Sequence, residues 1–421
     1  MCMLSKQSKT MKSMKRTIFT LLATVMMTVG AGAQEAELAE FKSTNLWLLD
    51  SVKVDSMYNY WDAYVQAHPK EELAWRKLFE VCSNQEYRLR IKNWEEGIAL
   101  HGKRVLPLLE RMKAAIPGTY QYYYCAHEGG YPMPLETQHT LADSAIALLS
   151  EKTIASDYEL WVQGLIVRRD TLKLTQVLTR YYESGQYPEE ALQYHFNELQ
   201  GMDEGGLYIG AHEGDIIGKL ILQLVLGVHR DKILYDENAA MNPDYLKSVF
   251  RNIGIPFDDQ TWNQLHATIW QEKTLTAIMR YIFDHSRRPV YLSAHNMQQL
   301  ILGQGLPDEL KACLYNEGLT MRYSAEPYDN RSVKRRNIEQ RYRLEYLRMS
   351  FHPQPKKDTR RFSFPAFAYA MNYMRLLHDQ LPYYKQHNRE RYYWLREIFA
   401  DIISQLDAMN IDVEEYKAYL L

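Results

Sequence analysis

Cysteine is scarce in this sequence, and long apolar runs are scarcer still. Only 4 of the 421 residues are cysteine, and three of these, Cys82, Cys125 and Cys313, follow residue 33. An odd number at wide spacing indicates neither a disulfide framework nor a zinc site, although a single disulfide pair stays open. Beyond residue 33 no stretch approaches the ~18 consecutive apolar residues of a membrane-spanning helix. We therefore expect no transmembrane segment in this part of the chain.

Catalytic signatures are missing as well. The sequence holds no His-Glu-x-x-His, Gly-x-Ser-x-Gly, Walker or Gly-x-Gly-x-x-Gly motif. We therefore predict no catalytic residue and no cofactor, and we favour a binding protein over an enzyme. Whether the chain holds a metal stays open at this point.

The first 33 residues have the pattern of a secretory signal peptide. Lys12, Lys15 and Arg16 precede an apolar run over 18–29, and small residues then offer a cleavage site after Ala33. Without this segment the chain keeps 45 basic and 52 acidic side chains, a formal charge of −7. We expect an exported, periplasmic protein, and its mild acidity argues against binding of nucleic acid.

Residues 34–200 have the periodicity of paired helices. The stretch "SGQYPEEALQY" (184–194) is similar to a tetratricopeptide repeat, because Gly185, Tyr187 and Ala191 occupy the small and aromatic positions at which two helices cross closely. No clean repeat of about 34 residues emerges. A degenerate helical repeat domain and an irregular helical bundle therefore both stay open.

Strands alternate with helices over residues 201–330. The segments "GGLYIGAH", "KILYD", "RPVYLSAHN" and "GLTMRYS" have the composition of four strands. Asn242 and Pro243 are typical of the cap and first position of a helix between them. This order predicts a small α/β domain with a parallel sheet. A helical segment over 331–421 follows, so the fold class is α/β plus all-α.

The α/β segment resembles a known family. "HEGD", an apolar helix, and Gln223, Gly227, Val228 and Asp231 follow the order found in the soluble part of the bacterial protein O-mannosyltransferase-like membrane family, whose function is poorly defined. "RPVYLSAHN" and "LYNEGLTMRYS" also resemble later segments of that family. The family's Gly-Asp-Asn-Asp turn is replaced here by His212-Glu213-Gly214-Asp215, and its membrane half is absent. The resemblance implies a fold and a periplasmic location rather than a transferase activity.

Polar side chains follow three of the predicted strands. They are His212, Glu213 and Asp215, then Asp236, Glu237 and Asn238, then His295 and Asn296. Ligands bind beyond the carboxyl ends of strands in open parallel sheets, so these residues form the candidate ligand site. A plainer interpretation is that Asp215 only caps the helix it begins. The string Ala-His-Glu-Gly also occurs at 126–129, which we interpret as coincidence.

A basic segment follows the α/β domain. Residues 331–348 are predicted as one helix, and its interaction-surface candidates are Arg331, Arg335, Arg336 and Arg341. Such a face suits lipid head groups or an acidic partner, but it is also typical of a solvated surface. Two functions stay open: a periplasmic interaction or scaffold protein that binds an envelope protein or peptide, and a carbohydrate- or glycosylation-related enzyme or accessory that uses the strand-end site.

Overall fold

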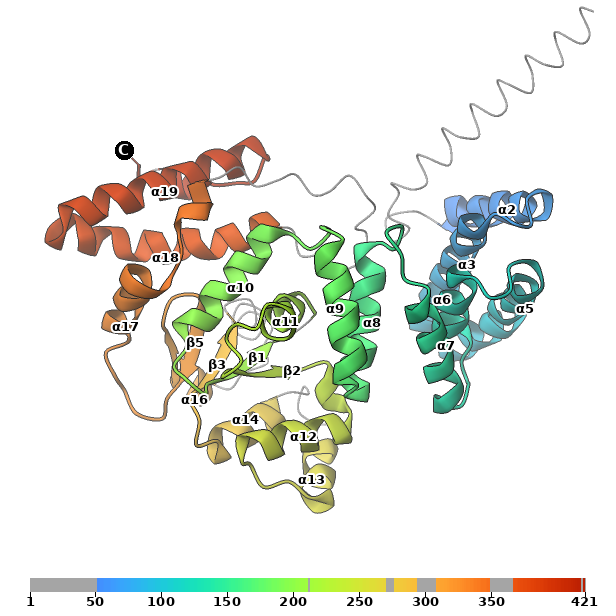
Figure 1. The fold of residues 1–421 in the computed structure, drawn as a ribbon, viewed down its shortest axis with the longest axis horizontal. Helices are drawn as coiled ribbons and strands as arrows, with labels where there is room; N and C mark the ends of the chain where they lie inside the picture. The colour runs from blue at the N-terminus through green and yellow to red at the C-terminus, as the bar shows by residue number, and fades with distance from the viewer. Residues whose placement is uncertain are drawn as a thin grey trace, which may run out of the picture. The chain divides into compact units, whose positions relative to one another are not determined.

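The chain forms two compact units, Met1–Leu148 and Leu149–Leu421, in a computed structural model (Figure 1). The structure describes residues 51–210, 213–269, 276–293, 308–348, 366–417 and 419–420. The predicted signal peptide lies outside these residues. The sequence suggested a boundary near residue 200, where composition changes. The compact units instead divide at Leu148, so three further helices belong with the sheet.

The described part of the first unit is helical. Its elements are α2 (Ser51–Ala67), α3 (Glu72–Lys92), α4 (Trp94–Leu100), a π-helical turn (His101–Val105), α5 (Leu106–Ala115), α6 (Tyr120–Gly129) and α7 (Leu135–Ala147). His68 and Pro69 lie between α2 and α3, and Glu72 lies in the first turn of α3, where the helix dipole favours a carboxylate. Trp61, Trp75 and Phe79 are buried in the core of this unit.

The second unit is built on a five-stranded sheet. The strands are β1 (Leu207–Gly210), β2 (Ile233–Asp236), β3 (Val290–Ser293), β4 (Leu314–Asn316) and β5 (Thr320–Tyr323), in the order β2-β1-β3-β5-β4. Strands β2, β1 and β3 are parallel, whereas β5 is antiparallel to β3 and to β4. The prediction of a purely parallel sheet is therefore wrong at β5, because a tight β4–β5 hairpin reverses the chain.

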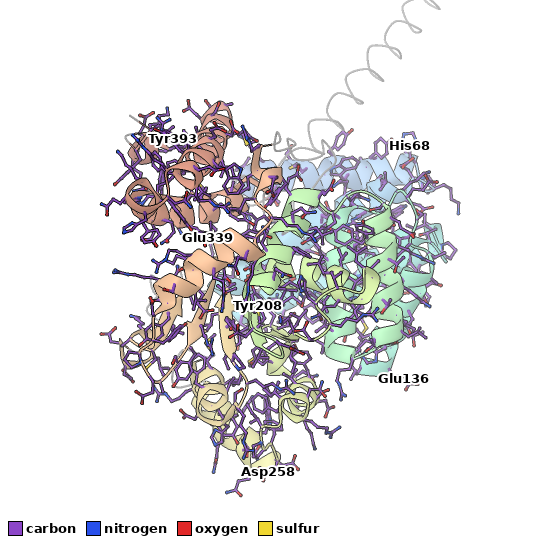
Figure 2. All side chains as sticks on the ribbon, turned by 60° about the vertical axis from the view of Figure 1, so that its left-hand side comes forward. His68, Glu136, Tyr208, Asp258, Glu339 and Tyr393 are labelled. Atoms are coloured by element: carbon purple, nitrogen blue, oxygen red, sulfur yellow. The ribbon has the colours of Figure 1, made fainter. Side chains whose placement is uncertain are left out.

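Helices surround this sheet. They are α8 (Ala155–Arg168), α9 (Thr171–Glu183), α10 (Glu189–Gly201), α11 (Glu213–Leu220), α12 (Pro243–Ile253), α13 (Asp259–Ile269), α14 (Thr276–His285) and the short α16 (Asp308–Lys311). In Figure 1, α10 and α11 lie on one side of the strands and α12 to α14 on the other. Tyr208 on β1 is fully buried toward α10 and α11, and Figure 2 shows it inside the unit, whereas Asp258 lies at the periphery.

Local sequence signals account well for α12. The Asn242 side chain accepts hydrogen bonds from the backbone N–H groups of Asp244 and Tyr245, and Pro243 occupies the first helical position. Gly254 ends the helix at φ +75°, a conformation that favours glycine. The cap, start and stop of this helix were all predictable from residue types.

The C-terminal segment forms a helical layer with a core of its own. Helices α18 (Ala366–His387) and α19 (Arg389–Ala408) pack against each other, and α20 (Glu414–Lys417) follows. Their buried aromatic and aliphatic residues form one cluster with Ala191 and Tyr194 of α10. This cluster joins the C-terminal layer to the α/β part of the unit.

The basic segment is not the single helix that was predicted. It comprises α17 (Asn330–Arg336), a π-helical turn (Asn337–Arg341), an extended residue at Tyr342 and a 3-10 turn (Glu345–Arg348). Tyr342 is buried, and its hydroxyl accepts a hydrogen bond from the backbone N–H of Leu319. Gly318 leaves room for the ring, since an added Cβ there would lie 2.5 Å from the Tyr342 hydroxyl. The backbone of Tyr342 is extended, at φ −79° and ψ 137°, so the helical conformation ends at this residue.

Candidate functional site

The carboxyl edge of the parallel strands is built around a close approach at Gly210. This residue ends β1, and an added Cβ would lie 2.6 Å from Cδ1 of Ile216 on α11. Real Cβ atoms do not come that close to a neighbouring carbon. Glycine at this position therefore allows the first turn of α11 to lie directly over the end of β1.

Asp215 connects that turn to a neighbouring strand. Its side chain is 2% exposed, and Oδ2 accepts a 2.9 Å hydrogen bond from the hydroxyl of Ser293, the last residue of β3. The Asp215 carboxylate therefore contacts a neighbouring strand. A residue that only capped its own helix would need no such contact. Ser293 was not among the predicted site residues, although its place at the end of an apolar strand was a usable signal.

Asp236 and Glu237 add two more buried carboxyl groups at the end of β2. Asp236 is 0% and Glu237 5% exposed. Oδ1 of Asp236 accepts hydrogen bonds from the backbone N–H groups of Asn238 and Ala239, which fixes the turn. Oε1 of Glu237 is buried with no hydrogen-bond partner among the described residues. Glu237 therefore brings a buried polar atom with hydrogen-bonding capacity to this edge.

The charge state of Glu237 follows from its surroundings. Burial raises the pKa of its carboxyl group, and the nearby charges of Asp236 and Asp215 raise it further, to about 8. At neutral pH the neutral acid is therefore the main form, and it can donate a hydrogen bond as well as accept one. The edge thus combines carboxylate acceptors with a carboxylic acid donor.

A buried polar network lies beneath this edge. Lys219 of α11 is 0% exposed, and its Nζ lies 2.5 Å from Oε2 of Glu198, 2.8 Å from Nδ1 of His195 and 2.8 Å from the carbonyl oxygen of Asp215. The ammonium has three N–H donors, and these three acceptors use all of them. Nδ1 of His195 also lies 2.9 Å from Oε2 of Glu198, so the imidazole, the ammonium and the carboxylate contact one another. The Tyr208 hydroxyl completes the network by donating to Glu198 Oε1 at 3.1 Å.

The network positions the edge above it. Lys219 ties α11 to α10 through Glu198 and also holds the backbone of Asp215, so it fixes the turn that carries the Asp215 carboxylate. None of Lys219, Glu198 and His195 was predicted from the sequence. A lone lysine within the apolar run "DIIGKLILQLVLG" was the available signal, because a buried lysine requires a partner.

Several predicted site residues fall outside what the structure describes. His212, His295 and Asn296 lie beyond the described residues, and for Glu213 only the backbone at the start of α11 is described. Asp215 and Asp236 are both at the edge, and Asn238 is exposed. Within the described ranges no group of three or more His, Cys, Asp or Glu side chains is placed to hold a metal ion. The other Ala-His-Glu-Gly string lies in α6, where Nδ1 of His127 is 3.1 Å from Glu128 Oε1.

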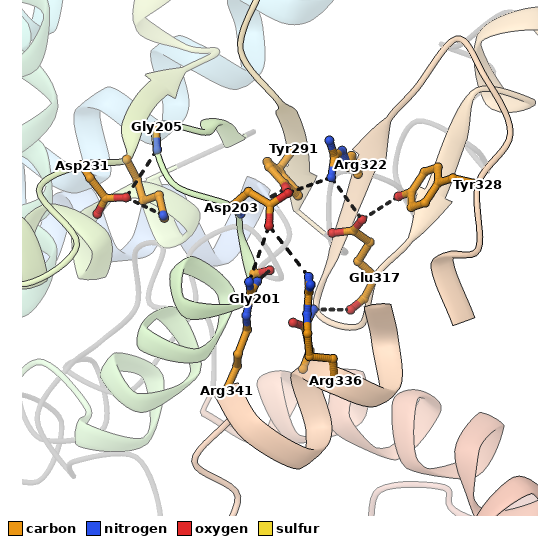
Figure 3. Close-up of polar contacts among 12 residues, drawn as sticks. Gly201, Asp203, Gly205, Asp231, Tyr291, Glu317, Arg322, Tyr328, Arg336 and Arg341 are labelled. Carbon is orange, nitrogen blue, oxygen red and sulfur yellow. Dashed lines mark hydrogen bonds and ion pairs between the residues drawn. The ribbon is translucent and has the colours of Figure 1, made fainter. Parts of the chain in front are cut away.

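The arginine residues proposed as an interaction surface have more specific contacts (Figure 3). Asp203 receives ion pairs from Arg322 at 2.9 Å, Arg341 at 3.5 Å and Arg336 at 3.8 Å. Arg335 lies 4.3 Å over the ring of Tyr383, and Arg331 is exposed. Two of the four predicted residues therefore connect the C-terminal segment to the chain just after α10.

Fold and site together define a predominantly helical protein with a small mixed-sheet α/β unit and buried carboxyl groups at its strand ends. Comparison with protein-family models, curated proteins and solved structures finds no match for this chain. Among the helices that the structure describes, none is long and apolar enough to cross a membrane.

Proposed function

We propose that this chain is an exported binding protein whose second unit holds a neutral, hydroxyl-rich ligand, such as a glycan, at the carboxyl edge of its parallel strands. The buried carboxyl group of Glu237 beside Asp215 and Asp236 is the observation that carries this proposal. A ligand hydroxyl both donates and accepts hydrogen bonds, and this edge offers acceptors together with one acid donor. A buried edge of this kind disfavours an anionic ligand, since it would add a further negative charge.

The family resemblance supports the same ligand class, because the named family is associated with glycosylation. The carboxyl groups would act here in recognition, with Asp215 accepting from a ligand hydroxyl and Glu237 donating to one. Ser293 and Lys219 serve as positioning residues, since one holds the Asp215 carboxylate and the other its backbone.

A titration with neutral oligosaccharides tests this proposal. We expect saturable heat of binding for the wild-type protein and at least a tenfold loss of affinity in Asp215→Ala and in Glu237→Leu, since each loses a hydrogen bond to a buried group, roughly 1.5 kcal/mol or more. Glu397→Gln is the matched control, because this glutamate is exposed on α19. Equal affinity in the control and in both site variants would place the ligand elsewhere.

A second function, binding of an envelope protein or peptide, is favoured by the first unit. Its helices α3 and α4 expose large apolar side chains, with Ile91 67% and Trp94 64% accessible. Exposed apolar groups that lie close together are typical of protein interaction sites. A helical repeat surface would present them to a partner. Ile91→Ser with Trp94→Ser should reduce chemical cross-linking to envelope proteins, whereas Leu172→Ser, 72% exposed on α9, should not.

A further inference from the structure

A pocket of about 270 Å³ lies at the opposite edge of the sheet, where β3 begins and β5 ends. Its lining includes three arginines, Arg287, Arg288 and Arg322, and no acidic residue. The rings of Phe283 and Tyr323 stack at 4.1 Å beside it. All these residues lie in the second unit, so the unit has carboxyl groups at one edge and guanidinium groups at the other.

Two of the three arginines are held in place. Nη1 of Arg288 donates a 3.2 Å hydrogen bond to the carbonyl oxygen of Gly205, and an added Cβ at Gly205 would lie 2.9 Å from that nitrogen. Arg322 is anchored on its other side by Asp203, as Figure 3 shows. A guanidinium that is already ordered loses less conformational entropy when it binds a ligand.

The neighbouring carboxylates do not neutralise this charge. Asp203 is shared by Arg322, Arg336 and Arg341. Glu317 lies 3.7 Å from Arg322 and accepts a 2.6 Å hydrogen bond from the Tyr328 hydroxyl. Arg287 and Arg288 are both exposed and add two further positive charges at the mouth of the pocket. The pocket and its surroundings therefore carry an excess of positive charge.

We propose that this pocket binds an oxyanion, namely the phosphate or carboxylate group of a small soluble ligand. The planar guanidinium presents paired N–H donors that match the oxygen spacing of phosphate and carboxylate groups. A volume of about 270 Å³ admits such a group together with a body no larger than a single sugar ring. This site is separate from the carboxyl-edge site, and its ligand is anionic where the ligand proposed for that edge is neutral.

Isothermal titration at low ionic strength tests the proposal with four probes: inorganic phosphate, glucose 6-phosphate, glucuronate and neutral glucose. We expect saturable binding of at least one anionic probe and none of glucose at the same concentrations. Binding of the phosphates alone identifies a phosphate site, and binding of glucuronate as well identifies a general oxyanion site. Absence of saturable binding for all three anions overturns the proposal.

Variants locate the site. Arg287→Gln combined with Arg288→Gln should weaken binding of the anionic probe by at least about tenfold, because the charge-assisted hydrogen bonds from both guanidinium groups to the anion are lost. Arg280→Gln is the matched control, since this exposed arginine of α14 pairs with Glu309 and does not line the pocket. Undiminished affinity in the double variant overturns the assignment. The arginine Nε–Hε NMR signals of the wild-type protein provide a second test, in which Arg287 and Arg288 shift on titration and Arg280 does not.

Discussion

The ammonium nitrogen of Lys219 lies 2.5 Å from a carboxylate oxygen of Glu198, and both side chains are 0% exposed. This pair joins α11 to α10, and the same ammonium donates to the carbonyl oxygen of Asp215 in the first turn of α11. Breaking a buried ion pair leaves a charge without its partner inside the protein, which costs far more than the loss of an exposed pair.

Replacing Lys219 tests the network. Lys219→Met should lower the free energy of unfolding by about 3–5 kcal/mol, because Glu198 is left buried without its cation. Combining it with Glu198→Gln should cost less than the sum of the single changes, since no charge remains. Chemical denaturation measures both. Lys311→Met, which removes an exposed pair with Asp308, should change stability by less than about 1 kcal/mol. A Lys219→Met protein as stable as this control would contradict the proposed role.

The raised pKa of Glu237 predicts a pH-dependent stability. Folding raises this pKa from 4.5 to about 8, so between these values the folded state keeps a proton that the unfolded chain has lost. Below pH 4.5 both states are protonated, and the retained proton makes its full contribution to the free energy of unfolding. As pH rises from 4.5 to about 8 this contribution is lost, and the free energy of unfolding falls by at most about 1.4 kcal/mol per pH unit.

Glu237→Gln isolates this effect. The amide does not titrate, so the variant should lose less stability than wild type between pH 5 and pH 9, as measured by denaturant titration at each pH. We expect the free energy of unfolding of the variant to increase relative to that of wild type as pH rises. Parallel stability profiles for the two proteins would show that Glu237 ionises normally.

Glycine at position 218 is predicted to be required for packing. An added Cβ would lie 2.2 Å from Cδ2 of His195 and 2.3 Å from the Tyr187 hydroxyl. Gly218→Ala should therefore cost about 1–3 kcal/mol, because α10 and α11 must move apart. Gly164→Ala is the control, since nothing lies within 4 Å of its added Cβ and alanine favours the helix by up to about 1 kcal/mol. Thermal unfolding should rank the two variants on opposite sides of wild type.

The cysteines are predicted to differ in reactivity. Cys82 and Cys125 are buried, Cys313 is half-buried, and burial raises the pKa of Cys82 to about 12. A thiol reagent such as Ellman's should therefore modify Cys313 first in the native protein and all three after denaturation. Rapid native labelling of Cys82 would contradict its buried position, and incomplete labelling after denaturation would indicate a disulfide.

Residue types predicted much of the second unit but not its full topology. The four predicted strand segments correspond to β1, β2, β3 and β5, and the start of α12 was predicted from Asn242 and Pro243. Strand β4 was missed because it has only three residues. The Asn-Glu-Gly turn between two apolar runs was a hairpin signal, and it would have given the reversed direction of β5.

The candidate site residues could be predicted only where they directly follow a predicted strand in the sequence. Asp236 ends β2 and Asp215 lies in the first turn of α11, and the rule for open sheets makes both candidates for a ligand site. Glu198 and His195 lie on α10, in a stretch that the sequence assigned to a different domain, and nothing in their spacing indicates Lys219 as a partner. Such contacts depend on how helices pack, which periodicity along one segment does not encode.

One titration tests the central claim most directly. Binding of a neutral oligosaccharide to wild type and to Glu237→Gln would be measured calorimetrically at pH 6.5 and pH 9. We predict that wild type binds more weakly at pH 9, because Glu237 has lost the proton it donates, while Glu237→Gln keeps an N–H donor and binds alike at both pH values. Wild-type affinity that does not change with pH, or no saturable binding at either pH, would contradict a ligand site at the carboxyl edge.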